Sequence, residues 1–150
     1  MRVRCISNTG EHLPENYLDP ARGYTQKIEL PLTVGKEYVV YAIRLWQGIV
    51  WYYICDDNYS YYPIQTPAPL FEVVDNRVSK YWRFMLNPNG VLRFVFEQWL
   101  NDSCFYDKLT DQEEAEVEIF DKVKELMDAE DFDLPPLDLA VEKLRETVTV

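Results

Sequence analysis

Hydrophobic residues in the first two thirds of the chain alternate with a two-residue period, which is typical of β-strands. β-Branched and aromatic residues are densest in residues 37–46 and 49–55, and Gly48 between them suits a tight hairpin turn. A second hairpin is indicated by the Asn-Pro-Asn-Gly segment at residues 87–90. The remaining strands are predicted at residues 2–7, 59–64, 70–74, 81–86 and 91–96, with one turn of 3₁₀ helix at residues 66–69.

The periodicity changes to a helical one after residue 99. Thr110, followed three residues later by Glu113, matches a capping box and predicts a helix over residues 111–129. A proline-containing acidic segment, residues 130–136, then precedes a shorter apolar series. The apolar stripe of the first helix comprises Ala115, Ile119, Val123 and Leu126, with Phe120 and Met127 beside it; that of the second comprises Leu137, Ala140, Val141, Leu144 and Val148. The C-terminal part is therefore expected to contain one or two amphipathic helices.

The order of elements in residues 2–74 resembles an SH3-like small barrel: a strand, a long loop, three strands joined by tight turns, a 3₁₀ break and a closing strand. The resemblance implies an α+β fold, in which an antiparallel SH3-like small β-barrel is extended by a β-hairpin and followed by the helices. We expect one domain over residues 1–150, with a β-rich aromatic barrel in residues 1–100 and an acidic helical part in residues 101–150 packed on it. The long loop lacks the acidic and aromatic signature of peptide-binding SH3 domains.

Formal charge is distributed unevenly along the chain. Residues 1–100 contain ten Lys/Arg and ten Asp/Glu, whereas residues 101–150 contain five Lys/Arg and sixteen Asp/Glu, which accounts for the whole net charge of −11. Such an acidic end repels nucleic acid and anionic membranes and attracts basic surfaces. No apolar run has the length of a membrane span, and the N-terminus turns polar too early for a signal peptide. We therefore expect a cytoplasmic protein with neither a nucleic-acid nor a membrane partner.

The first predicted helix carries carboxylates opposite its apolar stripe. The spacing of i, i+4, i+7, i+11 and i+14 would align them in a ridge about 20 Å long. This ridge is either a solvated helix face or a surface that meets a cationic partner and speeds the encounter with it. The candidate partner-binding residues of the ridge are Glu114, Glu118, Asp121, Glu125 and Asp128.

Aromatic side chains are concentrated between Tyr38 and Tyr62, where there are nine. Stacking platforms for single-stranded nucleic acid also need a basic groove, but Arg44 is the only Lys or Arg in this segment. Alternation directs half of the rings into the core. The others either pack beneath the helix or form a patch that binds a partner, for which Tyr and Trp are favoured. The candidates for such a patch are Trp46, Trp51, Tyr53, Tyr59 and Tyr61.

Residues for catalysis or metal binding are few. His12 is the only histidine, no glycine-rich phosphate loop is present, and Asp56-Asp57 reads as a turn. The three cysteines are widely spaced and odd in number, which argues against a disulfide framework or a zinc site and favours buried apolar cysteines. We therefore expect no enzymatic activity, no cofactor and no metal.

Small, acidic, single-domain proteins that lack catalytic groups resemble the immunity proteins of bacterial toxin systems. The resemblance rests on size, charge and aromatic content over the whole chain. It implies that the protein neutralises a cognate toxin, a basic protein such as a nuclease domain, by occluding its substrate cleft. The alternative is an SH3-like adaptor or ligand-binding module that holds a peptide or small molecule on its exposed aromatic face. An enzyme would have to rely on carboxylate chemistry, such as that of Asp56 and Asp57.

Overall fold

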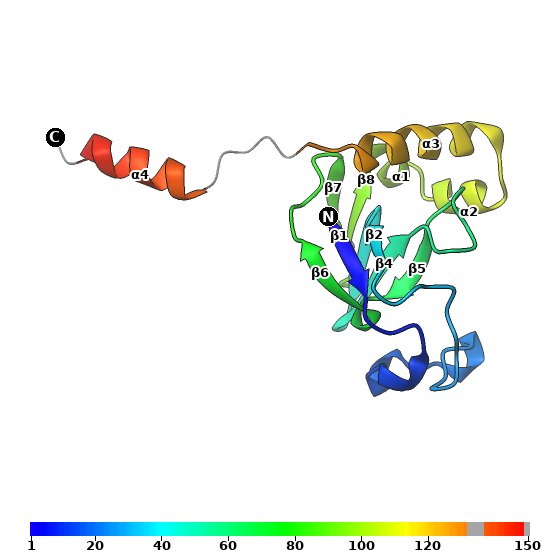
Figure 1. The fold of residues 1–150 in the computed structure, drawn as a ribbon. Coiled ribbons are helices and arrows are strands. Elements are labelled where there is room, and N and C mark those ends of the chain that lie inside the picture. Colours follow the sequence, from blue (N-terminus) through cyan, green and yellow to red (C-terminus); the bar gives the residue numbers. More distant parts are fainter. Residues whose placement is uncertain (132–136, 149–150) are drawn as a thin grey trace.

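The computed structural model of the chain describes residues 1–131 and 137–148 and has an α+β fold with two antiparallel sheets (Figure 1). The three-stranded sheet has the order β2-β1-β6, and the five-stranded sheet has the order β5-β4-β3-β8-β7. The strands are β1 (Arg2–Cys5), β2 (Glu37–Val39), β3 (Ala42–Trp46), β4 (Ile49–Ile54), β5 (Ile64–Pro67), β6 (Phe71–Asp75), β7 (Trp82–Leu86) and β8 (Leu92–Phe96).

The two sheets do not close into a barrel, because no strand pairing joins them within the described residues. The strand expected over residues 37–46 is in fact two strands, β2 and β3, which belong to different sheets. The chain changes partner at Val40 and Tyr41. The Val40 N–H donates to the carbonyl of Met1, whereas the Tyr41 N–H donates to the carbonyl of Tyr53. Both residues are buried, so this crossing point lies in the core between the sheets.

The predicted strand at residues 59–64 was placed too early along the chain. Strand β5 begins at Ile64 and includes Pro67, which had been assigned to the break. A proline is tolerated there because β5 is an edge strand of its sheet. The predicted 3₁₀ turn follows at Ala68–Leu70 and is confirmed.

The hairpin between β7 and β8 forms as predicted. The Asn87 N–H donates to the carbonyl of Val91 at 2.9 Å, and the Gly90 N–H donates to the carbonyl of Asn87 at the same distance. Gly90 has a φ of +88°, a conformation that L side chains rarely adopt. The turn chemistry of this segment therefore sets the hairpin.

Four helices follow or flank the last strand: α1 (Glu97–Leu100), α2 (Phe105–Thr110), α3 (Glu114–Asp128) and α4 (Leu137–Val148). The sequence did not predict α1 and α2. The predicted capping box at Thr110 does not form, because Thr110 ends α2 and its hydroxyl donates to the Asp107 carbonyl. In Figure 1, α1, α2 and α3 cover one end of the sheets, whereas α4 stands away from them.

Helix α3 packs on the sheets through part of the predicted stripe, since Ile119 and Val123 lie against the core. Phe120 and Met127 are buried, whereas Ala115 is exposed and Leu126 is 37% exposed. The Phe120 ring meets the Tyr41 ring edge-on, with 5.5 Å between centroids. The large side chains beside the stripe are thus the most deeply buried, and Phe120 has an aromatic partner in Tyr41.

Tyr41 connects the two sheets to α3. Its hydroxyl donates to Asp128 Oδ1 at 2.5 Å, and its carbonyl accepts the indole N–H of Trp82 at 2.8 Å. Lys124 Nζ binds Asp128 Oδ2 at 2.7 Å, which completes the pairing of that carboxylate. Burial, together with the hydrogen bond to Asp128, raises the pKa of Tyr41 above its usual value.

The sheet ends beneath the helices are filled with aromatic rings. Tyr53 meets Trp99 edge-on at 5.0 Å, and Trp99 stacks on Tyr106 at 5.2 Å. The rings of Phe96 and Phe105, whose centroids are 5.4 Å apart, belong to the same cluster. Such edge-on and stacked pairs stabilise a core beyond the area that they bury.

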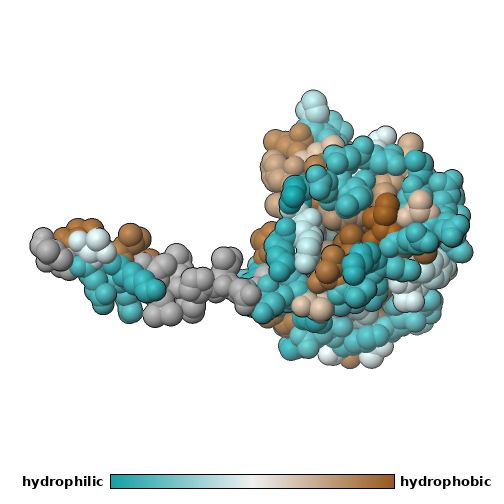
Figure 2. Space-filling view, turned by 90° about the horizontal axis from the view of Figure 1, so that it is seen from above, coloured by the Kyte–Doolittle hydropathy of each residue, from teal (hydrophilic) through white to brown (hydrophobic). Residues whose placement is uncertain are grey.

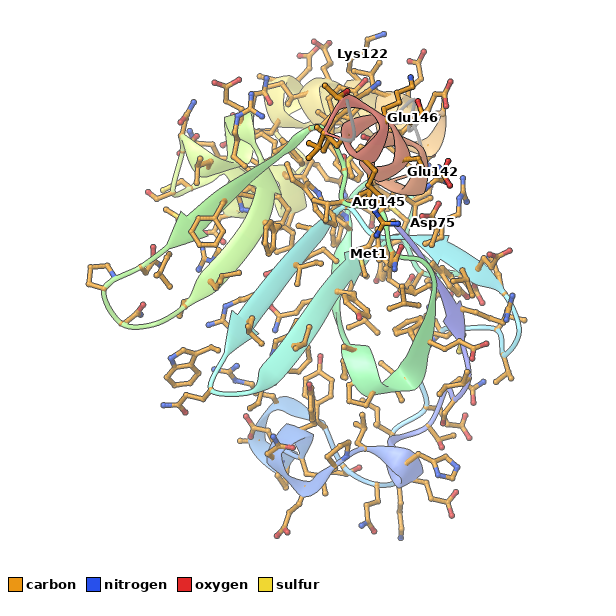
Figure 3. All side chains as sticks on the ribbon, turned by 90° about the vertical axis from the view of Figure 1, so that its left-hand side faces the viewer. Met1, Asp75, Lys122, Glu142, Arg145 and Glu146 are labelled. Atoms are coloured by element: carbon orange, nitrogen blue, oxygen red, sulfur yellow. The ribbon has the colours of Figure 1, made fainter. Side chains whose placement is uncertain are left out.

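The chain start is held beside the end of β6, as the labels of Figure 3 show for Met1 and Asp75. Arg2 of β1 pairs with Asp75 across the sheet. Hydrogen bonds from Arg77, whose Nη2 lies 2.6 Å from Asp75 Oδ2, hold the pKa of the Asp75 carboxyl well below its usual range.

Replacing Tyr41 with Phe should lower the free energy of unfolding by about 1–3 kcal/mol, because it removes a hydrogen bond to a charged group in a partly buried site. Urea denaturation followed by circular dichroism measures this change. Tyr59→Phe is the control, since Tyr59 is exposed and its replacement should leave the free energy of unfolding almost unchanged. An equal loss in both variants would show that the Tyr41–Asp128 contact does not anchor α3.

The protein should also lose stability in alkali. Burial and, after it, the hydrogen bond to Asp57 raise the pKa of Tyr38 to about 12, whereas an unfolded tyrosine titrates near about 10. Between these values the folded state holds more protons than the unfolded state, so the free energy of unfolding falls as pH rises. Urea titrations across this pH window should show that the free energy of unfolding falls less steeply with pH for Tyr38→Phe than for the native protein. Tyr59→Phe should keep the native slope, and three identical slopes would contradict the assignment.

Candidate functional site

Four of the five predicted ridge carboxylates project from the outer side of α3. Glu114, Glu118, Asp121 and Glu125 are exposed, and we call these four residues the acidic face. Asp128 differs, because it is half-buried and its carboxylate is occupied by Tyr41 and Lys124. The structure thus separates a carboxylate that docks the helix from four that are available to a partner.

The surroundings of the acidic face are strongly negative. Residues 101–131 contain three lysines and twelve Asp or Glu residues, which gives them a net charge of −9. Each lysine already pairs with a carboxylate: Lys108 with Asp102 at 3.0 Å, Lys124 with Asp128 at 2.7 Å, and Lys122 with Glu125 at 3.8 Å. Only Lys122 reaches the acidic face, and this exposed, long pair contributes little.

An apolar hollow of about 300 Å³ lies beside α3, where the helix meets the β7–β8 hairpin. Figure 2 looks onto this side of the molecule and shows an apolar strip surrounded by hydrophilic residues. Lys122, labelled at the outer side of α3 in Figure 3, belongs to the rim together with Lys80 and Arg83. The apolar residues that line the hollow are Tyr81, Phe96, Ile119, Val123 and Leu126.

The predicted aromatic candidates lie in three different environments. Tyr53 is only 8% exposed, and its hydroxyl donates to Gln65 Oε1 at 2.9 Å, so it belongs to the core. Tyr59 and Tyr61 form a cluster with Tyr62 in the turn before β5, with ring centroids 4.8–5.5 Å apart.

Trp46 and Trp51 lie near one another at the open end of the five-stranded sheet. Trp46 is 38% exposed, and its indole N–H donates to the carbonyl of Asn89 at 3.3 Å. Trp51 is half-buried between the rings of Tyr17 and Tyr24, at 5.9 and 5.3 Å. The two tryptophans, with Tyr24, line a second hollow of about 280 Å³.

Arg44 and Arg93 were not predicted as site residues. They lie directly opposite each other on β3 and β8, and Arg44 lines the second hollow. The sequence contained a signal for the first of them, because Arg44 is the single basic residue in the aromatic segment. Arg93 could not be recognised in the same way, since its pairing with β3 spans about fifty residues of chain.

The carboxylates considered for chemistry have structural partners instead. Asp56 accepts the backbone N–H groups of Asn58 and Tyr59, both at 2.9 Å. Burial alone would raise the pKa of Asp57, but its hydrogen bonds with Lys36, Thr33 and Tyr38 lower it below the usual value. Both residues therefore stabilise local structure.

Other reactive groups are dispersed. His12 lies exposed in a 3₁₀ turn, and no group of three or more His, Cys, Asp or Glu side chains in the described residues is placed to hold a metal ion. All three cysteines are free: Cys5 is buried as expected, whereas Cys104 is exposed, contrary to the expectation of buried cysteines.

Comparisons with known proteins identify no relative of this chain. Within residues 1–131 and 137–148, no helix combines the length and apolar character that crossing a membrane requires. Neither a protein-family model, nor a curated protein sequence, nor a solved structure matches the chain.

Proposed function

We propose that this protein is an immunity-type binding protein that neutralises a cognate bacterial toxin, a basic protein such as a nuclease domain, by covering its substrate cleft. The observation that carries the proposal is the acidic face of α3, whose four carboxylates project outward from a segment with a net charge of −9. A cleft that binds nucleic acid is lined by Lys and Arg, and these would pair with the acidic face.

The docking of α3 supports this role, because a rigid surface binds with less loss of conformational entropy. Phe120 and Met127 are buried beneath the helix, and Asp128 is held by Tyr41. The carboxylates of the acidic face are therefore presented from a fixed backbone.

The apolar hollow beside α3 supplies a second element of a binding surface. Charge pairs at the rim of an interface mainly accelerate association, whereas buried apolar contacts slow dissociation. Ile119, Val123 and Leu126 line the hollow on the same helix that carries the acidic face. A partner that pairs with the carboxylates could insert an apolar side chain beside them.

The test is capture of a partner from the native host, followed by measurement of its association rate. The native protein should capture a basic protein that arrests growth when it is expressed alone, and co-expression should restore growth. Changing the acidic face by Glu114→Gln, Glu118→Gln, Asp121→Asn and Glu125→Gln should slow association at least about tenfold at low salt. The difference should shrink as salt screens the charges.

A matched control changes four other exposed carboxylates to Gln: Glu11, Glu15, Glu29 and Glu37. Its net charge changes by the same amount, so it separates the local effect of α3 from the effect of overall charge. The proposal fails if both quadruple variants associate at the same rate, or if the captured protein is acidic or harmless to growth.

A further inference from the structure

We propose that the hollow beside Arg44 binds a small organic anion that carries a flat ring. This proposal does not depend on the role of α3. The hollow lies at the open end of the five-stranded sheet, and its volume is about 280 Å³. Its principal lining residues are Arg22, Tyr24, Arg44, Trp46, Trp51 and Gln65.

The register of the sheet sets two arginines opposite each other, of which Arg44 lines this hollow, whereas Arg93 lines a separate hollow beside Trp99. Arg44 of β3 pairs with Trp51 of β4 on one side and with Arg93 of β8 on the other, so all three share one face of the sheet. Like charges directly opposite each other destabilise a sheet. An anion bound beside Arg44 would reduce this repulsion, because it would offset the charge of the Arg44 guanidinium.

Neither arginine has an anionic partner within residues 1–131 and 137–148. No hydrogen bond or ion pair of the Arg44 side chain is found in the described part of the chain, and the same holds for Arg93. Arg93 Nε is also the single buried side-chain nitrogen or oxygen there that lacks a hydrogen-bond partner. The one acidic residue that lines the hollow, Asp19, lies 3.5 Å from the guanidinium of Arg22. Because Arg93 lines a different hollow, the guanidinium that an acceptor can meet here is that of Arg44, which is half-buried.

The walls of the hollow indicate a ring. Trp51 is held by a tilted contact with Tyr17 and an edge contact with Tyr24, and Trp46 is held by the hydrogen bond of its indole to the Asn89 carbonyl. Trp46 nevertheless remains 38% exposed, which leaves part of its ring free for contact. Aromatic side chains stack favourably on flat rings, and a guanidinium binds a carboxylate or phosphate through two parallel hydrogen bonds.

Size and charge limit the ligand to a small molecule. A volume of about 280 Å³ is at the lower end for ligand pockets and suits one or two rings with a single anionic group. A long polyanion would be repelled by the net charge of −11. The ligand class is therefore an aromatic carboxylate or an aromatic phosphate monoester, which share the same contacts.

Titration of the ¹⁵N-labelled full chain, observed through its four tryptophan indole N–H signals, tests the proposal. Benzoate and phenyl phosphate are the probes; phenol lacks the charge and inorganic phosphate lacks the ring. We expect at least one aromatic anion to shift the signals of Trp46 and Trp51 in a saturable way. Phenol and inorganic phosphate should bind at least about tenfold more weakly. The buried Trp82 and Trp99 serve as internal references and should not move.

Arg44→Gln should weaken binding of the aromatic anion at least about tenfold without changing that of phenol. Arg145→Gln is the matched control, because it removes the same charge from an exposed position on α4, away from the hollow, and should bind as the native protein does (Figure 1). If Arg44→Gln does not fold, Trp46→Ala at the exposed end of β3 is used instead. This variant should bind both the aromatic anion and phenol more weakly than the native protein does. The proposal is overturned if neither aromatic anion binds with a Kd below about 10 mM. It is also overturned if the changes at Arg44 and Trp46 leave binding unaffected.

Discussion

The contact between Tyr41 and Asp128 holds the two parts of this protein together. Tyr41 lies where the chain leaves the three-stranded sheet and enters the five-stranded one, and its carbonyl receives the Trp82 indole from β7. Because the same residue binds the last residue of α3, the junction of the sheets and the docking of the helix depend on one side chain. The exposure of the acidic face, Glu114, Glu118, Asp121 and Glu125, follows from the rotation that this contact and the buried Phe120 impose on α3.

Two surfaces with opposite chemistry result from this arrangement. The helical end of the sheets is covered by α1, α2 and α3 and is negative on its outer side. The open end of the five-stranded sheet is bordered by the 3₁₀ helices Glu15–Tyr17 and Pro20–Arg22 and presents Arg44 among aromatic rings. A neutral body with an acidic end, as the sequence describes it, therefore includes a local cationic site within the neutral part.

Local patterns in the sequence predicted those elements that depend on local chemistry. The β3–β4 and β7–β8 hairpins, the 3₁₀ turn at Ala68–Leu70 and the amphipathic α4 all follow from turn residues or periodicity. The break at Tyr41 could not be predicted, because Val40 and Tyr41 are both good strand residues and the change of partner is a tertiary event. Helices α1 and α2 are too short to show a period. The spacing of the carboxylates identified the acidic face, but only the fold reveals that Asp128 belongs to the interior contact and that Arg44 faces Arg93.

The pairing of β3 with β8 has a consequence for how the chain is made. Strand β3 is synthesised long before residues 92–96 leave the ribosome, so the edge that β8 will cover is open during that interval. An unpaired edge of a strand with apolar neighbours can pair with another chain and so lead to aggregation. Arg44 lies in the middle of that edge strand, and a charge there discourages pairing with another copy before β8 arrives. The Arg44 side chain can therefore hinder aggregation of the nascent chain and also form part of the cationic site of the folded protein.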